Sequence, residues 1–261
     1  ILTGHGGDEL FSGYPVFKFA RTQQGYYYSL AEMIHFAYFL MSKFKKNKSP
    51  EYGRYLPVLW SHEMQQKLFG DKQMPFEEAW KPLERLQTSF ESEIEKVFQT
   101  YFQVYLNGLL IVEDKISMAH SLESRTPILD NELIDLSLSI PQELKLNASN
   151  LKAIIKHNAR SLLPKTYFSQ PKRGFPTPLR IWLRSSHRRL IEEKLLGKNS
   201  QLDSVFDGST LREIAKGYSI SPRRLFRPLD EIQSHRIWQL FSLESWLRTW
   251  RVKYNLTLRL P

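Results

Sequence analysis

The residues with the clearest chemical character stand at the start of the chain, where residues 1–14 read ILTGHGGDELFSGY. The three glycines within residues 4–7 allow the backbone to approach a bulky anion, because glycine has no side chain and tolerates positive φ. The carboxylates of Asp8 and Glu9 can cap a helix or hold a divalent cation against a phosphate. The spacing is neither that of a Walker A loop nor that of a dinucleotide fingerprint. Two interpretations therefore stay open for this segment alone, a phosphate-binding turn and a glycine-rich turn with an acidic helix cap.

Two further segments carry charged residues at positions where a reaction could use them. Residues 110–130 read LIVEDKISMAHSLESRTPILD and include Asp114, Glu123 and Arg125. The third segment, KRGFPTPLRIW, begins at Lys172, in a loop whose prolines and glycine restrict its path. Taken alone, the first set is also explained by an ion-pair network at a helix end, and the lysine by a solvated loop charge.

In this order, the three segments resemble the synthetase domain of glutamine-dependent asparagine synthetases. The motifs of that family read G-x-G-G-D-E-x-F-x-G-Y, D-x-x-S-M-A-x-x-x-E-x-R-x-P-x-L-D and K-x-G-F-x-x-P-x-x-x-W, and the chain matches them between Ile1 and Trp182. The remainder matches only loosely, through the aromatic-rich end at residues 238–250. The resemblance implies an ATP-dependent carbon–nitrogen ligase of asparagine biosynthesis. Aspartate would attack the α-phosphorus of ATP, and ammonia from glutamine would then attack the resulting β-aspartyl-AMP.

The resemblance also assigns roles to single residues. Asp8 matches the acidic residue beside pyrophosphate and Mg²⁺, and Lys172 matches a lysine that neutralises charge on the transferring groups. ATP and Mg²⁺ are thus the expected cofactors, with Asp8 as the metal ligand. The expected catalytic residues are His5, Lys172 and Glu123, and the expected nucleotide-binding residues are Thr3, Gly4, Gly6, Asp8, Glu9, Asp114 and Arg125.

His5 departs from the family pattern, because many members carry a glutamate or aspartate at this position. A neutral imidazole can accept a proton near neutral pH, so the proton-transfer role can survive. The departure also leaves open a related enzyme that joins a different amine to its acyl-adenylate, such as a β-lactam synthetase or a peptide macrolactam cyclase. The non-enzymatic alternative is a basic, helical interaction module.

Two features of the full-length family are missing from this sequence. The chain has no cysteine, so it cannot supply the nucleophilic cysteine of a glutaminase domain. It also lacks the S-G-G-x-D-S loop that wraps the pyrophosphate of ATP. We therefore expect residues 1–261 to be the C-terminal part of the synthetase domain, inactive alone, with the N-terminal glutaminase and pyrophosphate-loop part as its partner.

The elements that would position these residues are mostly helices. Residues 1–3 are predicted to form a strand that leads into the glycine turn, followed by a helix. A helical pattern runs from residue 75 to about residue 119, with breaks predicted at Pro82 and at Asn107–Gly108. Within it, apolar residues at helical spacing predict a buried stripe, namely Phe90, Ile94, Val97, Tyr101, Val104 and Tyr105.

Caps and breakers predict further helices downstream. One begins after Asp130, one is capped by Asn150 and ends before Pro164, and one begins at Thr177–Pro178. Residues 26–44 favour a buried helix over a membrane span or an interfacial helix, and residues 228–250 favour a closing helix. The fold expected is mainly α. By resemblance it is the helical C-terminal part of an α/β adenine-nucleotide α-hydrolase-like (PP-loop ATP pyrophosphatase) domain, with one remnant β-strand at the N-terminus.

Composition limits the classes of molecule that the chain is expected to bind. The net charge is +10, which favours anionic partners, and no zinc-finger, RRM or basic-zipper pattern accompanies the basic residues, so nucleic acid is not expected. A charged fraction of 25% argues against a membrane protein. Aspartate, ATP and ammonia are therefore the expected small-molecule partners. The absence of cysteine fits a cytoplasmic location, and the oligomeric state is left open, a homo-oligomer included.

Overall fold

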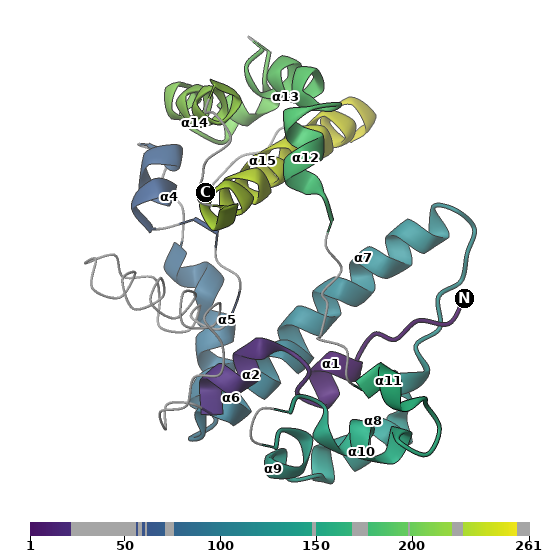
Figure 1. Ribbon diagram of the computed structural model, residues 1–261. Helices are drawn as coiled ribbons and strands as arrows, with labels where there is room; N and C mark the ends of the chain where they lie inside the picture. The colour runs from purple at the N-terminus through teal and green to yellow at the C-terminus, as the bar shows by residue number, and fades with distance from the viewer. Residues whose placement is uncertain are drawn as a thin grey trace. The chain divides into compact units, whose positions relative to one another are not determined.

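The computed structural model describes residues 1–21, 56, 59–60, 62–70, 76–147, 150–168, 177–197, 199–220 and 227–254 (Figure 1). The described residues are mainly helical, as expected. The predicted helix at residues 26–44 and the loop that holds Lys172 lie outside the described residues. None of the helices within these ranges is both long enough and apolar enough to cross a lipid bilayer.

The chain divides into two compact units. Unit 1 consists of residues 1–45, 50–55 and 77–172, and unit 2 consists of residues 46–49, 56–76 and 173–261. The helices of unit 1, in chain order, are α1 (Gly7–Leu10), α2 (Pro15–Arg21), α5 (Phe76–Thr88), α6 (Glu93–Thr100), the π-helix η3 (Tyr101–Tyr105), α7 (Leu106–Met118), the 3-10 helix η4 (Pro127–Leu129), α8 (Asn131–Ser139), α9 (Gln142–Lys145), α10 (Ala153–Ala159) and α11 (Lys165–Phe168).

Unit 1 is built around the continuous helical rod formed by α6, η3 and α7 (Figure 1). Helix α2 packs against α6, while α1 packs against η3 and α8. The core between them is lined by buried apolar side chains, namely Phe17, Ala20, Val97, Phe98, Tyr101, Leu146 and Leu151. The short helix α1 is thereby held by the interior of the unit, which fixes the glycine turn that precedes it.

The predicted apolar stripe is confirmed for part of its length. Val97 and Tyr101 are buried, but the side chain of Val104 is 42% exposed. The difference is explained by the π-helix η3, which contains Val104, because its wider turn moves Val104 around the helix axis, away from the line of Val97 and Tyr101.

The two predicted breaks in this region are wrong. Pro82 lies inside α5, and α7 runs through Asn107 and Gly108 without interruption. Proline and glycine carry a local cost of about 3 and 1 kcal/mol in a helix interior. In α5 the burial of Leu83 offsets part of the cost of Pro82. The smaller cost of Gly108 does not end α7, which continues directly from α6 and η3.

The predicted strand at the N-terminus is reduced to a single contact. Leu2 forms an isolated parallel bridge with Arg125, and the described residues contain no longer strand. A strand needs a ladder of neighbours, and here only one residue of the second motif lies alongside.

Of the three predicted helix starts, one is confirmed and two are wrong. Asp130 caps α8, accepting a hydrogen bond from the backbone N–H of Glu132 at 3.0 Å, as expected. Asn150 does not cap α10. It forms an isolated antiparallel bridge with Asn147, and α10 begins later, after Lys152. Pro178 likewise stands just before α12 (Leu179–Arg184) rather than at its first position.

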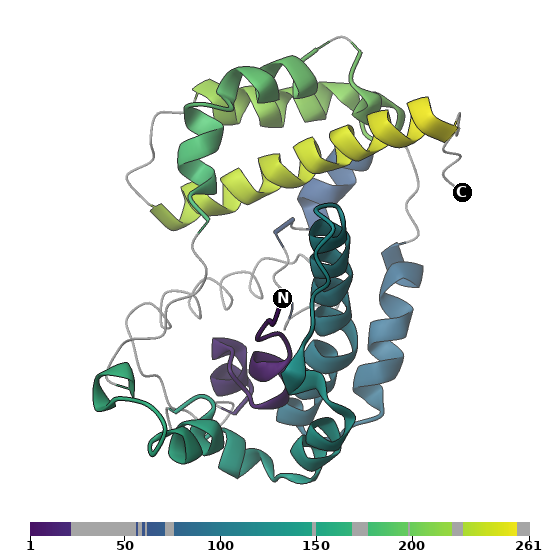
Figure 2. The ribbon, with the colours of Figure 1, turned by 90° about the vertical axis from the view of Figure 1, so that its right-hand side faces the viewer.

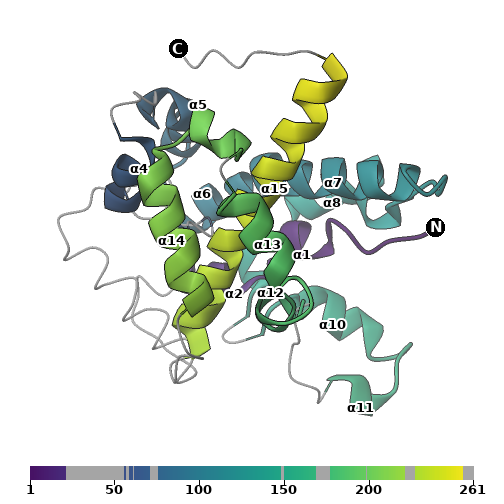
Figure 3. The same ribbon diagram turned by 90° about the horizontal axis from the view of Figure 1, so that it is seen from above.

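Unit 2 has its own core around the longest helix. Its helices are α4 (His62–Phe69), α12, α13 (Arg188–Leu195), the 3-10 helix η5 (Gln201–Ser204), α14 (Gly208–Ile220) and α15 (Arg227–Tyr254). Helix α15 packs against α12, α13 and α14 (Figures 2 and 3). Its fully buried Glu244 accepts hydrogen bonds from the Ser200 hydroxyl and from the backbone N–H of Leu202, both at 3.1 Å. The Glu244 carboxylate thus accepts hydrogen bonds from the first residues of η5 and its cap from inside the core.

Candidate functional site

The first two motifs are joined through their backbones in unit 1. The N–H of Thr3 donates to the carbonyl of Arg125 at 2.9 Å, and the N–H of Arg125 donates to the carbonyl of Ile1 at 2.8 Å. Segments more than a hundred positions apart in the sequence therefore lie side by side at the entrance to the glycine turn.

The glycine turn lies against the side chains of Ile128 and Leu129 in the second motif. Gly6 has a φ of 88°, in the left-handed region that favours glycine, and its carbonyl accepts from the N–H of Leu10 at 2.8 Å to start α1. A side chain at Gly6 would overlap the side chain of Leu129, and one at Gly7 would come within 3.3 Å of Ile128. The turn therefore needs both its backbone conformation and its lack of side chains.

His5 is half-buried and held from within the turn. Its Nδ1 lies 3.1 Å from the hydroxyl oxygen of Thr3, with the tautomer deciding which of the two donates. The contact fixes the ring orientation, and the other ring nitrogen remains the one that a substrate could use.

Asp8 opens α1 and forms an ion pair with Lys152. Its carboxylate oxygen lies 3.0 Å from the lysine Nζ, and the two side chains are 31% and 29% exposed. Gly13 lies so close to both that a side chain there would overlap the Asp8 carboxylate and the lysine stem. Lys152 itself has a left-handed φ of 55°, which is unusual for a residue with a side chain. Sequence reasoning missed Lys152, because nothing in its spacing connects it to a residue so distant along the chain.

Glu9 turns away from Asp8 into the interior. It is only 2% exposed, and the Tyr14 hydroxyl donates to its Oε1 at 2.6 Å. Burial raises the pKa of the Tyr14 hydroxyl well above its ordinary value, and the bond to Glu9 raises it further. Tyr101 and Tyr105 enclose the pair, with their ring centroids 5.0 and 5.7 Å from that of Tyr14.

The charged side chains of the second motif are exposed. Arg125 and Glu123 form an ion pair with each other, and both side chains are about 70% exposed. Asp114 is exposed near the end of α7. Nearby, the Ser124 hydroxyl donates to Glu113 at 3.0 Å, which ties the segment after α7 back to that helix. Backbone pairing thus brings this motif to the turn, while its three predicted site residues face solvent within unit 1.

The surroundings of Asp8 suit a magnesium ion that is ligated mainly by substrate phosphates. Within the described ranges, no three His, Asp or Glu side chains gather closely enough to form a metal cage. Magnesium at nucleotide sites is commonly held by one or two carboxylates together with substrate phosphates. The single, partly exposed Asp8 carboxylate suits that arrangement, and its Lys152 partner is a second group able to contact a phosphate.

Comparison with known proteins identifies the family of this chain. The family model described as Asparagine synthase matches residues 1–248. The chain is 24% identical over 262 residues to asparagine synthetase (glutamine-hydrolyzing) 1 of Bacillus subtilis (strain 168), which covers 93% of this chain and 40% of that protein. It is 24% identical over 204 residues to asparagine synthetase (glutamine-hydrolyzing) 3 of the same organism, covering 78% of this chain and 30% of that protein.

A protein with a different name is also similar. Over 144 residues the chain is 24% identical to amidase chry2 of Gibberella zeae, covering 53% of this chain and 20% of that protein. The chain therefore spans well under half the length of each of these relatives. No solved structure matches it. The family match extends over nearly all of its residues and includes the joined first and second motifs, and the chain belongs to the asparagine synthase family.

Proposed function

We propose that this chain is part of an enzyme that makes asparagine from aspartate, ATP and ammonia released from glutamine. The match to the asparagine synthase family and to its named relatives supports ATP-dependent asparagine formation in general. The observation that carries the proposal to this chain is the pairing of Thr3 with Arg125, which sets the glycine turn against the second motif.

In the first step, an oxygen of the aspartate side-chain carboxylate attacks the α-phosphorus of ATP. The bond between that phosphorus and the bridging oxygen breaks, and pyrophosphate leaves with β-aspartyl-AMP as the other product. The backbone of Thr3, Gly4 and Gly6 would lie against the nucleotide, and Asp8 would hold Mg²⁺, which supplies charge neutralisation on the phosphates when bound. Lys172 would stabilise charge on the transferring group.

In the second step, ammonia attacks the acyl carbon of the adenylate, AMP leaves, and the nitrogen loses a proton. His5 is the proposed proton acceptor, because Thr3 fixes its ring at the turn. Glu123 is proposed beside the reacting groups, and Asp114 and Arg125 toward the nucleotide. Glu9 was predicted to contact the nucleotide, but its burial against Tyr14 favours a role in holding the turn.

The finer fold proposed is the helical part of a PP-loop ATP pyrophosphatase domain, completed by a companion segment with a parallel sheet. The bridge to Arg125 uses groups of Ile1 and Thr3, so the N–H and C=O of Leu2 face the opposite edge. Leu2 is 76% exposed, and Ile111, Val112, Ile116 and Met118 on α7 are each more than half exposed. A neighbouring sheet would cover these apolar groups.

Isotope transfer tests the proposed reaction. The intact protein that carries this chain should form asparagine, AMP and pyrophosphate from ATP, ammonia and aspartate labelled with ¹⁸O in its side-chain carboxylate. One ¹⁸O should appear in AMP, because attack on the α-phosphorus leaves a carboxylate oxygen there. Formation of ADP and phosphate, or AMP without the label, would contradict the β-aspartyl-AMP intermediate.

A second acyl-adenylate enzyme remains a candidate because His5 stands where many family members carry a carboxylate. β-Lactam synthetase and macrolactam cyclase activities join a different amine to the same type of intermediate, and the similarity to a protein named amidase is compatible with a broader set of amide reactions. Labelled AMP formation with carboxylic acids other than aspartate, but not with aspartate, would favour this alternative.

A glutamine amidotransferase activity requires a nucleophile that this cysteine-free chain does not contain, so a companion glutaminase part is proposed. The cytoplasm is the proposed location, since the lack of cysteine fits a reducing compartment. The 261 residues alone are expected to release no AMP in response to aspartate, and measurable release would contradict this.

A further inference from the structure

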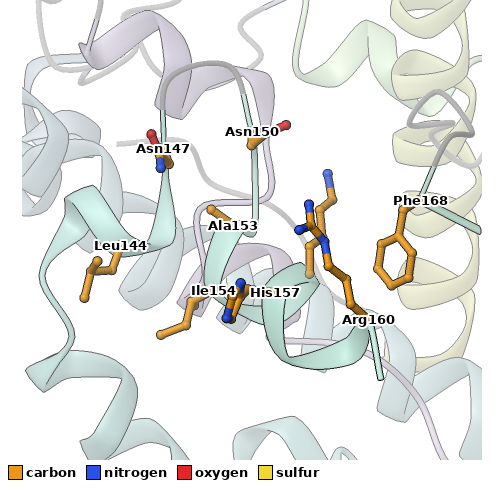
Figure 4. A pocket seen from close by; sticks show the side chains of 9 residues that line it. Leu144, Asn147, Asn150, Ala153, Ile154, His157, Arg160 and Phe168 are labelled. Atoms are coloured by element: carbon orange, nitrogen blue, oxygen red, sulfur yellow. The ribbon is translucent and has the colours of Figure 1, made fainter. Parts of the chain in front are cut away.

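A pocket with a volume of about 390 Å³ lies in unit 1, and its lining does not include the residues of the glycine turn (Figure 4). It is lined by residues of α9, the Asn147–Asn150 bridge, α10 with the residue that ends it, and α11. Side chains that give it chemical character are Asn147, Asn150, Lys156, His157, Arg160 and Phe168. A volume of this size is within the usual range for small-molecule sites.

The polar lining of the pocket favours an anion. Lys156, His157 and Arg160 all come from α10 or the residue that ends it, and no carboxylate is among the lining residues that the structure describes. Lys156 and Arg160 are four residues apart, so their side chains project from neighbouring turns on one side of the helix. Across the described ranges, none of the ion pairs involves His157 or Arg160.

The charge of the lining favours phosphate over a carboxylate. The fork of a guanidinium matches the oxygens of either group, but an ammonium on the adjacent turn adds a second positive charge, which suits a phosphate dianion better than a carboxylate. The amides of Asn147 and Asn150 can supply further donors. In Figure 4, Arg160 rises from the end of α10 toward the bridge, and the ring of Phe168 lies on its other side, where it can cover an apolar or planar part of a ligand.

We propose that this pocket binds a small molecule that bears a phosphate group, separately from the Asp8 turn. The two places use different residues, because Lys152 pairs with Asp8 and does not line the pocket. Phosphate binding in this pocket therefore does not depend on whether the chain takes part in asparagine formation.

Arginine labelling of the intact protein tests the proposal directly. Phenylglyoxal reacts with exposed guanidinium groups, and mass spectrometry resolves the rate at Arg160 from that at Arg189, whose side chain is 91% exposed in unit 2. Inorganic phosphate at about ten times its dissociation constant should slow labelling of Arg160 about tenfold and leave Arg189 unaffected. Phenyl phosphate should protect at lower concentration if Phe168 covers its ring, and equal protection would identify phosphate alone as the recognised group.

Two variants and a carboxylate control make the test specific. Lys156→Gln should raise the phosphate concentration needed for protection on the order of tenfold, because it removes one of the two charges. Lys165→Gln makes the same change in charge at an exposed residue outside the pocket and should leave protection unchanged. The proposal is overturned if neither phosphate compound protects Arg160, if acetate at equal ionic strength protects equally, or if both variants behave alike.

Discussion

The Tyr14 hydroxyl donates a hydrogen bond of 2.6 Å to the buried carboxyl group of Glu9, within one motif and five residues apart. This bond closes the segment from the start of α1 to the start of α2 into a compact loop. Asp8, the neighbour of Glu9, is left pointing outward to Lys152. The two adjacent acidic residues therefore have opposite surroundings, Glu9 in the interior against Tyr14 and Asp8 partly exposed beside Lys152.

Tyr14→Phe should lower the free energy of unfolding by about 1–3 kcal/mol, because it leaves a buried carboxyl group without its donor. The raised pKa of Tyr14 means that its stabilising effect is complete below the ordinary tyrosine pKa of 10.0 and declines as pH rises above it. Denaturant unfolding at neutral pH measures the difference. Tyr105→Phe is the control, because Tyr105 makes ring contacts but no hydrogen bond through its hydroxyl among the described residues. Equal losses in both variants would contradict the special role of the Glu9 bond.

Gly13→Ala should impair the Asp8 site more than the fold. The added methyl group would overlap the Asp8 carboxylate and Lys152, so one of the two must move. Small displacements of positioned groups can cost about a hundredfold in rate, and we expect a loss of that order in AMP formation by the intact protein. Gly217→Ala in α14 is the matched control, since no neighbouring atom lies within 4 Å and helix propensity favours alanine. Unchanged activity in Gly13→Ala would show that the Asp8 and Lys152 pair is dispensable.

Lys145 should make stability rise with pH in mildly alkaline solution. It is 1% exposed, with its Nζ 4.5 Å from the centre of the Phe98 ring, and burial lowers its pKa from the ordinary 10.5 to about 8. Between these two pH values the unfolded chain binds more protons than the folded one, so stability increases across this window, by on the order of 3 kcal/mol at most.

Unfolding free energies at several pH values between 7.5 and 9.5, approximately the lower part of that window, test the effect. Lys145→Met should remove most of the rise, because its side chain has no proton to lose. Lys165→Met, at an exposed lysine, should keep the rise of the unaltered protein. Parallel pH curves for all three proteins would rule out Lys145 as the cause.

Local sequence was a good guide where the determinant was also local. The left-handed turn at Gly6, the cap at Asp130 and the closing helix α15 each depend on residues close together in the chain. The same reasoning failed at Pro82 and Gly108, because a single unfavourable residue does not end a helix whose other residues sustain it.

Partners of the site residues that lie far away along the chain could not be predicted from local sequence. Motif matching identified Asp8, but the partner of Asp8 is Lys152, which the fold brings from the other end of unit 1. Motif matching also treated Glu9 as equivalent to its neighbour, because the direction of a side chain in a short helix depends on what packs beside it. The burial of Glu9 against Tyr14 became evident only from the structure. The role of Lys172 stays a prediction, since that residue lies outside the described ranges.

The most direct test of the proposed chemistry is aspartate-dependent exchange of labelled pyrophosphate into ATP by the intact protein, because it isolates the first step from ammonia supply. If Lys172 stabilises charge on the transferring group, Lys172→Ala should slow exchange on the order of a hundredfold or more. Arg173→Ala, one residue along, should have a milder effect. Exchange that depends on aspartate and is lost selectively in Lys172→Ala is the predicted result, and equal, small effects of both substitutions would contradict the assignment.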